Sequence, residues 1–401
     1  DPNDPSAQAN LLKLARELEE LRHDALLANP LLEFDKLLLL KRKRGQLGLP
    51  VNHKCNTGIE RTGYDNEIAI LEPVRPGGPP LGGKLRTVFR PPATEFVGEM
   101  DLHFDGDKLL FTMPKGPTWQ IFEIKMDGTG LRQVSRGEHP DVDNFDACYL
   151  PDGRIVFAST ASYTAVPCWH GVERACNIYL MDADGSNMRQ LCFDQDLDLH
   201  PAVLPTGQVI FSRWDYTGPM HIYLRPLMVM NPDGTGQRAV YGSNSYWPNA
   251  LYFPRGIPDA PGKIIAIIAG YHGVPRMGEL GLFDTTKGWH EAAGVVQRIP
   301  GRGKPVTAVI RDNLVDKSWP KFLHPYPLSE KYLLVASQPD NKSPWGIYLV
   351  DVFDNMLPII VQPKFDFFEP IPLAKTQRPP IIPDRVDLQR DDAVVYIDDV
   401  Y

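Results

Sequence analysis

The sequence predicts an all-β protein, a six-bladed β-propeller with a short N-terminal helical arm. Two observations lead to this fold class. Units of about 50 residues, each with four short strands, recur along the chain, and a repeat of that length is typical of a propeller blade. Proline accounts for 39 of the 401 residues, about twice the usual ~5%, which disfavours a helical protein.

The outer half of each expected blade is a hairpin with an Asp-Gly turn. Three such hairpins align: IFEIKMDGTGLRQV (121–134), NIYLMDADGSNMRQL (177–191) and MVMNPDGTGQRAV (228–240). Their turn aspartates, Asp127, Asp184 and Asp233, are 57 and 49 residues apart. Asp-Gly suits such a turn because glycine accepts a positive φ at low cost.

The inner half of each blade carries a second repeated turn, as in YLPDGRIVFAST (149–160), VLPTGQVIFSRW (203–214) and, more loosely, HFDGDKLLFTM (103–113). With strands named a to d from the axis outward, strand a is expected to begin near Leu102, Phe145, Leu199, Tyr246, Leu323 and Phe368. The fourth and fifth blades continue through KIIAIIAG (263–270), ELGLFDT (279–285), KYLLVAS (331–337) and GIYLVDV (346–352). These six starts predict six blades.

The two ends of the chain are expected to close the sixth blade. Strands a and b are assigned to 367–383, with b at PPIIP (379–383), and strands c and d to 66–90. Such a closure removes exposed sheet edges. The propeller then covers 61–401 and is preceded by an N-terminal arm, 1–60.

The arm contains an amphipathic helix, because Leu11, Leu14, Leu18 and Leu21 follow a helical period. Either this helix packs against the propeller, or it binds a partner, including a second copy of the chain.

Charge and hydropathy exclude two classes of partner. The formal net charge is −8 and the sequence pI about 5.7, whereas proteins that bind nucleic acid through its phosphates need a basic surface. Apolar runs such as KLLLL (36–40) are far shorter than the ~20 residues of a membrane span. The abrupt ends, DPNDPSAQAN and AVVYIDDVY, suggest a piece of a longer protein.

Function is expected on the face that carries the b–c and d–a connections. The b–c connections are long and chemically rich: MPKGPTW (113–119), STASYTAVPCWHGVERAC (159–176), SRWDYTGPMH (212–221), AGYHGVPRMGE (269–279) and SQPDNKSPWG (337–346). Binding residues concentrate in loops held by a rigid scaffold. We refer to this side as the loop-rich face.

The start of strand a places one residue of each blade at the mouth of the central channel. The repeat aligns His103, Asp146, His200, Trp247, His324 and Glu369 at this position. Histidine and carboxylate are the ligands of zinc, copper and iron. The sequence therefore predicts a transition-metal site made of His103, Asp146, His200, His324 and Glu369; the alternative is a polar, water-filled channel mouth.

Further candidates follow the b strands. Catalytic candidates are Arg213, Asp215, Tyr271 and His272, which would hold a substrate anion or relay a proton, or else form structural ion pairs. A glycan-active enzyme, which needs two carboxylates about 5–10 Å apart, is a further alternative.

The CWHGVERAC loop holds the cofactor-binding candidates Cys168, His170 and Cys176. A local disulfide between the two cysteines is the other interpretation, and it would indicate an oxidising compartment. Three tryptophans either stack on a sugar or a porphyrin or cap the apolar layers between blades: Trp169, Trp214 and Trp345.

Several strings resemble known families. The Asp-Gly hairpins and Pro-Asp-Gly turns look like TolB-type propeller repeats. From about residue 60 to the end, the chain resembles the hydrazine synthase alpha-subunit family, in GYDNEIAILEPVRPGG, DLHFDGDKLLFTM, GSNSYWPNALY, YHGVPRMGELGLFD, LVDKSWPKFLHPYPLS, WGIYLVDVFDNM and PPIIPDRVD.

This resemblance implies a periplasmic or other extracytoplasmic protein whose propeller supports a redox, metal or haem site. It also implies c-type haem domains elsewhere in the protein and a cytochrome-like domain or subunit as partner. An enzyme of this kind would be a haem- or metal-dependent oxidoreductase. The chain has no C-x-x-C-H motif, so conventional haem attachment is not expected within these residues. The alternative is a non-catalytic scaffold that binds a ligand or a protein.

Overall fold

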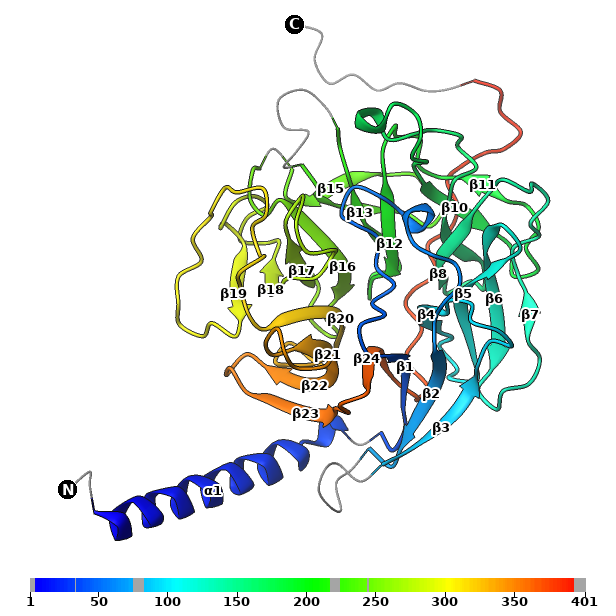
Figure 1. Ribbon diagram of the computed structural model, residues 1–401. Coiled ribbons are helices and arrows are strands. Elements are labelled where there is room, and N and C mark those ends of the chain that lie inside the picture. Colours follow the sequence, from blue (N-terminus) through cyan, green and yellow to red (C-terminus); the bar gives the residue numbers. More distant parts are fainter. Residues whose placement is uncertain (1–3, 33, 75–82, 217–223, 244, 393–401) are drawn as a thin grey trace, which may run out of the picture.

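The computed structural model describes residues 4–32, 34–74, 83–216, 224–243 and 245–392. Within them, the strands form six four-stranded antiparallel sheets arranged as blades around a central axis (Figure 1). The predicted six-bladed propeller is confirmed, with one α-helix, α1 (Pro5–Leu27), at its N-terminal end.

Strand order within each blade follows the chain in five of the six sheets. From the axis outward, the first blade is β4 (Gly98–Leu102), β5 (Lys108–Lys115), β6 (Thr118–Lys125) and β7 (Arg132–Gln133). The second is β8 (Asn144–Tyr149), β9 (Ile155–Ser159), β10 (Asn177–Met181) and β11 (Arg189–Gln190). The third is β12 (Asp198–Val203), β13 (Val209–Arg213), β14 (Leu227–Met230) and β15 (Arg238–Tyr241).

The remaining blades complete the ring. The fourth is β16 (Ala250–Gly256), β17 (Lys263–Ala269), β18 (Glu279–Asp284) and β19 (Val295–Ile299). The fifth is β20 (Lys321–Pro327), β21 (Tyr332–Gln338), β22 (Gly346–Asp351) and β23 (Met356–Ile360). Three short 3-10 turns complete the described elements: η1 (Pro30–Leu32), η2 (Asn56–Gly58) and η3 (Pro167–Trp169).

The sixth blade differs from the expectation in its second strand. Its order is β24 (Phe365–Pro372), β1 (Leu37–Lys43), β2 (Asn66–Glu72) and β3 (Lys84–Phe89). The assignment of strand b to 379–383 is therefore wrong, whereas the outer strands lie within the expected 66–90. The physical reason is hydrophobicity, because all four leucines of 37–40 are buried and Ile381 is 61% exposed. One strand from the C-terminal side thus pairs with three from the N-terminal side.

The Asp-Gly turns form as predicted. The side chains of Asp127, Asp184 and Asp233 each accept a hydrogen bond from the backbone N–H two residues on, at 2.8, 2.9 and 3.0 Å. The glycine that follows each aspartate has a φ of 81–89°, which is why glycine is needed there. The expected long connection at 113–119 is instead a tight hairpin between β5 and β6.

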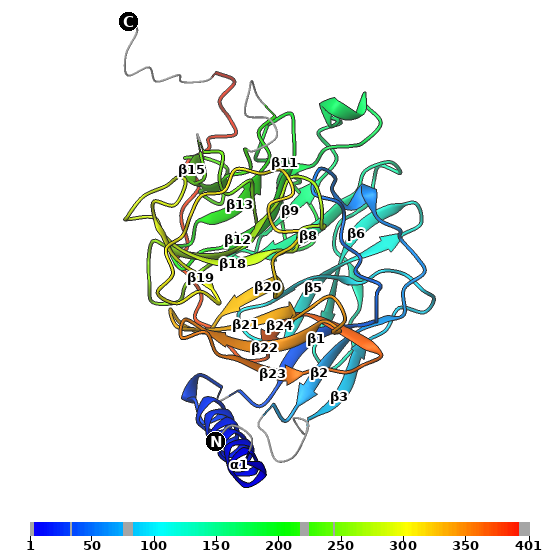
Figure 2. The same ribbon diagram turned by 60° about the vertical axis from the view of Figure 1, so that its left-hand side comes forward.

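The helix α1 does not pack against the propeller along its length. Five of its leucines are exposed: Leu11, Leu12, Leu14, Leu18 and Leu21 are 62–68% accessible. Figure 2 shows the helix projecting from the ring of blades. Only its C-terminal end contacts the fifth blade, where Arg22 Nε donates to Asn355 Oδ1 at 2.8 Å. No helix in the described residues is long and apolar enough to cross a membrane.

Two extended segments cross the central channel, one at each end. The upper strap, residues 44–60, connects β1 to β2 over the loop-rich face and crosses the middle of the ring (Figure 1). The lower strap, residues 373–386, is red in Figure 1 and passes under the inner turns of the first three blades. There Thr376 N donates to Phe104 O at 2.9 Å, and a side chain at Gly207 would lie 2.1 Å from Pro380 O.

We predict that replacing Leu40 of β1 with Ala lowers the free energy of unfolding by ~2–5 kcal/mol, because Leu40 is 1% exposed and its loss leaves a cavity in the sixth blade. The matched control is Ile381→Ala, in the segment first expected to be that strand; it should change stability by less than ~0.5 kcal/mol. Urea unfolding of both variants measures this. Equal losses would contradict the observed closure.

Candidate functional site

The innermost strand of every blade contains a β-bulge that directs one side chain toward the axis. These six residues, which we call the axial ring, are Glu99, Asp146, His200, Phe253, His324 and Glu369. Each has a positive φ, between 50° and 57°, at a register shift between the innermost strand and its neighbour. A left-handed backbone is uncommon outside glycine, so its sixfold repetition marks a built feature of the fold.

Four of the six aligned positions were predicted correctly: Asp146, His200, His324 and Glu369. The alignment was wrong for His103 and Trp247, because Glu99 and Phe253 occupy the ring in their blades. His103 lies instead at the far end of β4, with its Nδ1 3.5 Å from Asp105 and 3.4 Å from Asp107. The predicted five-residue metal site is therefore not assembled as a unit.

Carboxylates form one half of the axial ring and link each blade to the next. Glu369 accepts hydrogen bonds from the backbone N–H of Glu99 and of Met100, at 2.9 and 2.6 Å. Glu99 accepts from the backbone of Asp146 at 3.0 Å. Asp146 in turn accepts from the backbone of His200 at 2.8 Å, and its Oδ2 lies 3.0 Å from His200 Nδ1.

Aromatic rings form the other half. The His200 and Phe253 rings are 4.1 Å apart, and Phe253 and His324 are 4.5 Å apart, centroid to centroid. His200 Nε2 also lies 3.0 Å from Nη1 of Arg276, which is 1% exposed. The His324 Nδ1 atom is buried without a hydrogen-bond partner, and burial holds the pKa of His324 well below its ordinary value.

The upper strap closes the axial ring from the loop-rich side. Asn56 Nδ2 donates to Glu99 at 2.8 Å, and the Lys54 carbonyl accepts from Arg276 Nη2 at 2.5 Å. Asn52 Oδ1 accepts from the Arg276 backbone at 2.5 Å. Below the ring lies a cavity of about 50 Å³ lined by Glu99, Asp146, Arg255, His324, Tyr326 and Glu369, among others. This volume holds a few water molecules at most.

Burial and neighbouring charges shift the pKa values of groups in and beside the axial ring. Burial, reinforced by the negative charges of Asp146 and Glu369, raises the pKa of Glu99 to about 8, so this side chain is neutral at pH 7. Burial lowers the pKa of Arg42, beside the same ring, to about 10. The ring is thus a buried polar layer in which Glu99 takes up a proton and His324 stays neutral.

Metal ligation by the axial ring faces competition from these hydrogen bonds. Asp146 and Glu369 already accept backbone N–H groups, which leaves His324 as the ring member with an unused nitrogen. The metal site therefore stays a prediction that the ring's hydrogen bonding does not favour.

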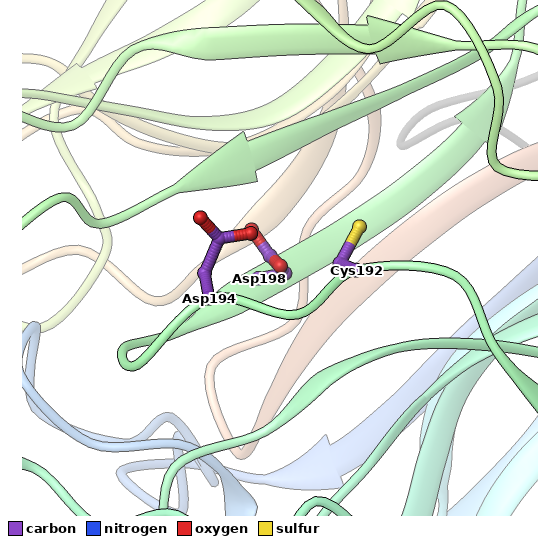
Figure 3. Close-up of side chains that lie close together, drawn as sticks. All are labelled: Cys192, Asp194 and Asp198. Carbon is purple, nitrogen blue, oxygen red and sulfur yellow. The ribbon is translucent and has the colours of Figure 1, made fainter. Parts of the chain in front are cut away.

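One group of three potential ligands does lie together in the described chain: Cys192, Asp194 and Asp198, whose ligand atoms are all within 4.8 Å of one another (Figure 3). Arg213 already neutralises it, at 2.5 Å from Asp194 and 2.8 Å from Asp198. Arg213, a catalytic candidate, thus forms ion pairs within the chain, as its structural alternative expects. Asp215, another catalytic candidate, lies two residues beyond Arg213 and is half-buried.

A second polar group lies on the loop-rich face, and we call it the surface cluster: His53, Cys168, Trp169, Tyr271 and His272. His53 comes from the upper strap, the next two from the β9–β10 connection and the last two from the β17–β18 connection. The His53 ring stacks on Trp169 at 5.3 Å and 12° and meets the His272 ring edge-on at 5.7 Å. Tyr271 and His272 are 4.3 Å apart.

Asp312 orients the exposed histidine of the cluster. Its Oδ2 lies 2.7 Å from His272 Nδ1, and its Oδ1 accepts from the His272 backbone at 3.1 Å. The His272 side chain is 52% exposed. In a neutral imidazole, a carboxylate at Nδ1 favours the tautomer in which Nδ1 carries the proton and Nε2 keeps a lone pair.

The buried side chain of Arg225 packs against the surface cluster. Its guanidinium lies 4.4 Å from the Tyr271 ring and 4.5 Å from the Trp214 ring. Burial, together with the charges of Arg225 and other neighbours, lowers the pKa of His53 to about 4. His53 is therefore neutral at pH 7, and its buried Nδ1 has no hydrogen-bond partner.

The structure thus brings together the candidates Tyr271, His272 and Cys168. His170 follows in the same turn and is exposed. Cys176 is buried whereas Cys168 is exposed, and no disulfide joins them in this structure. Trp169 is 39% exposed, while Trp214 and Trp345 are buried and cap apolar layers. Sequence reasoning missed His53, Arg225 and Asp312, since nothing in their local sequence shows that they meet.

Among solved structures, the propeller is similar to Kuenenia stuttgartiensis hydrazine synthase, with a TM-score of 0.63 and 17% identity, over 87% of this chain and 48% of that one. It is also similar to TolB from Acinetobacter baumannii, with a TM-score of 0.53 and 11% identity, over 84% of this chain and 66% of that one. The chain spans about half the length of the first of these. At such identities the likeness supports the fold. No protein-family model and no curated protein sequence matches the chain.

We predict that Glu99→Gln flattens the pH dependence of stability. The pKa of Glu99 rises from an ordinary 4.5 to about 8 on folding. Between these values the folded chain holds a proton that the unfolded chain releases, so stability falls with rising pH, by up to about 1.4 kcal/mol per pH unit. The glutamine stays neutral, and Asn56 Oδ1, which is buried and unpaired, can accept from its amide.

The variant should therefore match the wild type near pH 4.5 and exceed it in stability at pH 8, in urea unfolding measured at both values. Glu138→Gln, at an exposed site, is the control and should leave the profile unchanged. Parallel wild-type and Glu99→Gln profiles would show that Glu99 is ionised in the folded protein.

Proposed function

We propose that this chain is the propeller platform of a periplasmic or otherwise extracytoplasmic protein. Its loop-rich face supports a redox-active metal or haem group that a c-type cytochrome domain or subunit contributes. The observation that carries this proposal is His272, half-exposed and hydrogen-bonded through Nδ1 to Asp312. Metal-binding histidines are oriented in this way, with a carboxylate on the nitrogen that does not bind.

The neighbours of His272 fit such a group. His53 is kept neutral, which is the form that binds metals, and the stacked rings of His53 and Trp169 place an aromatic surface beside His272. Cys168 adds an exposed thiol. His272 is the residue that would hold the group, with His53 and Cys168 beside it, and a bound haem or transition metal would supply electron transfer or Lewis acidity.

Two further points support a partner domain. The upper strap crosses the channel mouth, so access to a site on this face comes from outside the propeller. The chain also spans about half of the hydrazine synthase chain to which its fold is similar. If the assembly is an enzyme, we expect a haem- or metal-dependent oxidoreductase.

The test is the optical spectrum and metal content of the protein purified with its native partners. We expect a Soret band or a stoichiometric transition metal. His272→Gln should shift or remove this signal, because the side chain of glutamine lacks the imidazole nitrogen that would bind the metal. His290→Gln, on the exposed β18–β19 connection, is the matched control and should leave the spectrum unchanged. A metal-free protein without absorption above the aromatic bands would overturn the proposal.

The rival function is a scaffold that binds a ligand or protein without chemistry. It is favoured by the axial ring, whose carboxylates are all engaged within the chain. A stable partner recovered with a featureless spectrum would select this function instead.

We also propose that α1 associates with a second copy of the chain. Leu11, Leu14, Leu18 and Leu21 form one stripe with spacings of three and four residues, and all are at least 62% exposed. This spacing is that of a coiled-coil seam.

The double variant Leu14→Glu/Leu18→Glu should therefore halve the mass of the full chain measured by light scattering, because it places charges in the seam. Leu12→Glu is the matched control: this leucine is also 62% exposed but lies off the stripe, so association should persist. A wild type that is already monomeric would refute self-association through α1.

A further inference from the structure

Two cysteines from distant parts of the chain meet beneath the surface cluster. Cys55 lies on the upper strap just before η2, and Cys176 lies just before β10 in the second blade. Both are fully buried and belong to one apolar cluster, which also contains Phe96, Trp119 and Phe145. Each thiol affects the pKa of the other: the Cys176 thiol lowers the pKa of Cys55, and the Cys55 thiol adds to burial in raising the pKa of Cys176.

The surroundings of the pair define it as a unit. Cys55 Sγ is 3.4 Å from the Arg174 carbonyl, two residues before Cys176, and 3.3 Å from Thr57 Oγ1. Cys176 Sγ is 3.5 Å from the Asp198 carbonyl. The other cysteines lie elsewhere, since Cys148 and Cys192 belong to a different cluster and Cys168 is exposed.

We propose that Cys55 and Cys176 form a disulfide that fastens the upper strap to the second blade. Cys55 Sγ already lies 3.4 Å from the backbone carbonyl two residues before Cys176, and both side chains belong to the same buried cluster, so a short movement brings the sulfurs to the S–S bond length of about 2.05 Å.

The oxidant is the disulfide of a protein thiol oxidoreductase. The Cys55 thiolate attacks one sulfur of that disulfide and forms a mixed disulfide, with one oxidoreductase thiol released. The Cys176 thiolate then attacks Cys55 Sγ, which forms the intrachain bond and releases the second thiol. Two protons and two electrons thus pass from the pair to the oxidoreductase. Since both sulfurs are buried in the folded chain, the exchange takes place before the strap closes, during folding.

The disulfide would stabilise other parts of the folded protein as well as the strap. It closes a loop from residue 55 to residue 176, and cross-links that close long loops restrict the unfolded chain most. The strap carries His53 of the surface cluster and Asn56, which binds Glu99 of the axial ring. This inference rests on the extracytoplasmic location in the proposed function, where disulfides form, but not on a metal or haem, so a spectrum without either would leave it intact.

The test is alkylation of the full chain, folded under oxidising conditions and then denatured, followed by mass spectrometry with and without reduction. Of the five cysteines, we expect three to react before reduction and all five after it. The unreduced digest should contain a peptide linking Cys55 to Cys176. Five reactive thiols before reduction, or a link between Cys168 and Cys176, would overturn the proposal.

Thermal unfolding provides a second readout. Reductant should lower the Tm of the wild type by several degrees. The Cys55→Ala/Cys176→Ala variant should unfold near the reduced wild type and not respond to reductant. Cys168→Ala is the matched control, because it removes the exposed thiol and should keep both the link and the reductant-sensitive Tm. A double variant that still responds to reductant would contradict the pairing.

Discussion

Charge buried at the propeller axis is the constraint on which the rest of the structure depends. Six innermost strands converge there, and each places one side chain from a bulge into a space too small for bulk water. An ionised group removed from water is stable only if it is paired, hydrogen-bonded or neutralised. Glu369 and Asp146 are satisfied by backbone N–H groups of the next blade, while Glu99 is kept protonated. The polar layer therefore also joins the blades.

The same constraint explains why the propeller needs its straps. Arg42 and Arg276 are almost fully buried, and each donates to a carbonyl of the upper strap, at Leu47 and Lys54. A propeller without the strap would expose both guanidinium groups at an open channel mouth. Because the upper strap occupies the channel mouth, the exposed polar side chains lie on its outer side, where His53 contacts Trp169 and His272. The closed channel and the surface cluster thus have one cause.

Sequence reasoning identified the repeat correctly and erred where the repeat is irregular. The Asp-Gly turns at Asp127, Asp184 and Asp233 have a local signal, so six blades could be predicted without long-range information. In the first blade the looser match HFDGDKLLFTM marks the turn after β4, so the alignment placed the ring position four residues too late, at His103 and not at Glu99. The KLLLL segment was recognised as apolar, but its pairing with β24, more than 300 residues away, depends on how the ring closes.

The surface cluster was only half predictable for the same reason. Tyr271 and His272 follow a strand and could be placed at its end, whereas His53 and Asp312 belong to connections whose course depends on the assembled blades. Asn52, which binds the carbonyls of Gly270 and Val274, positions the strap beside the β17–β18 connection. Within five residues, 52–56, the strap then contributes to the surface cluster, to the cysteine pair and to the axial ring. A change that displaces this segment must therefore act on all three together, although they come from different blades.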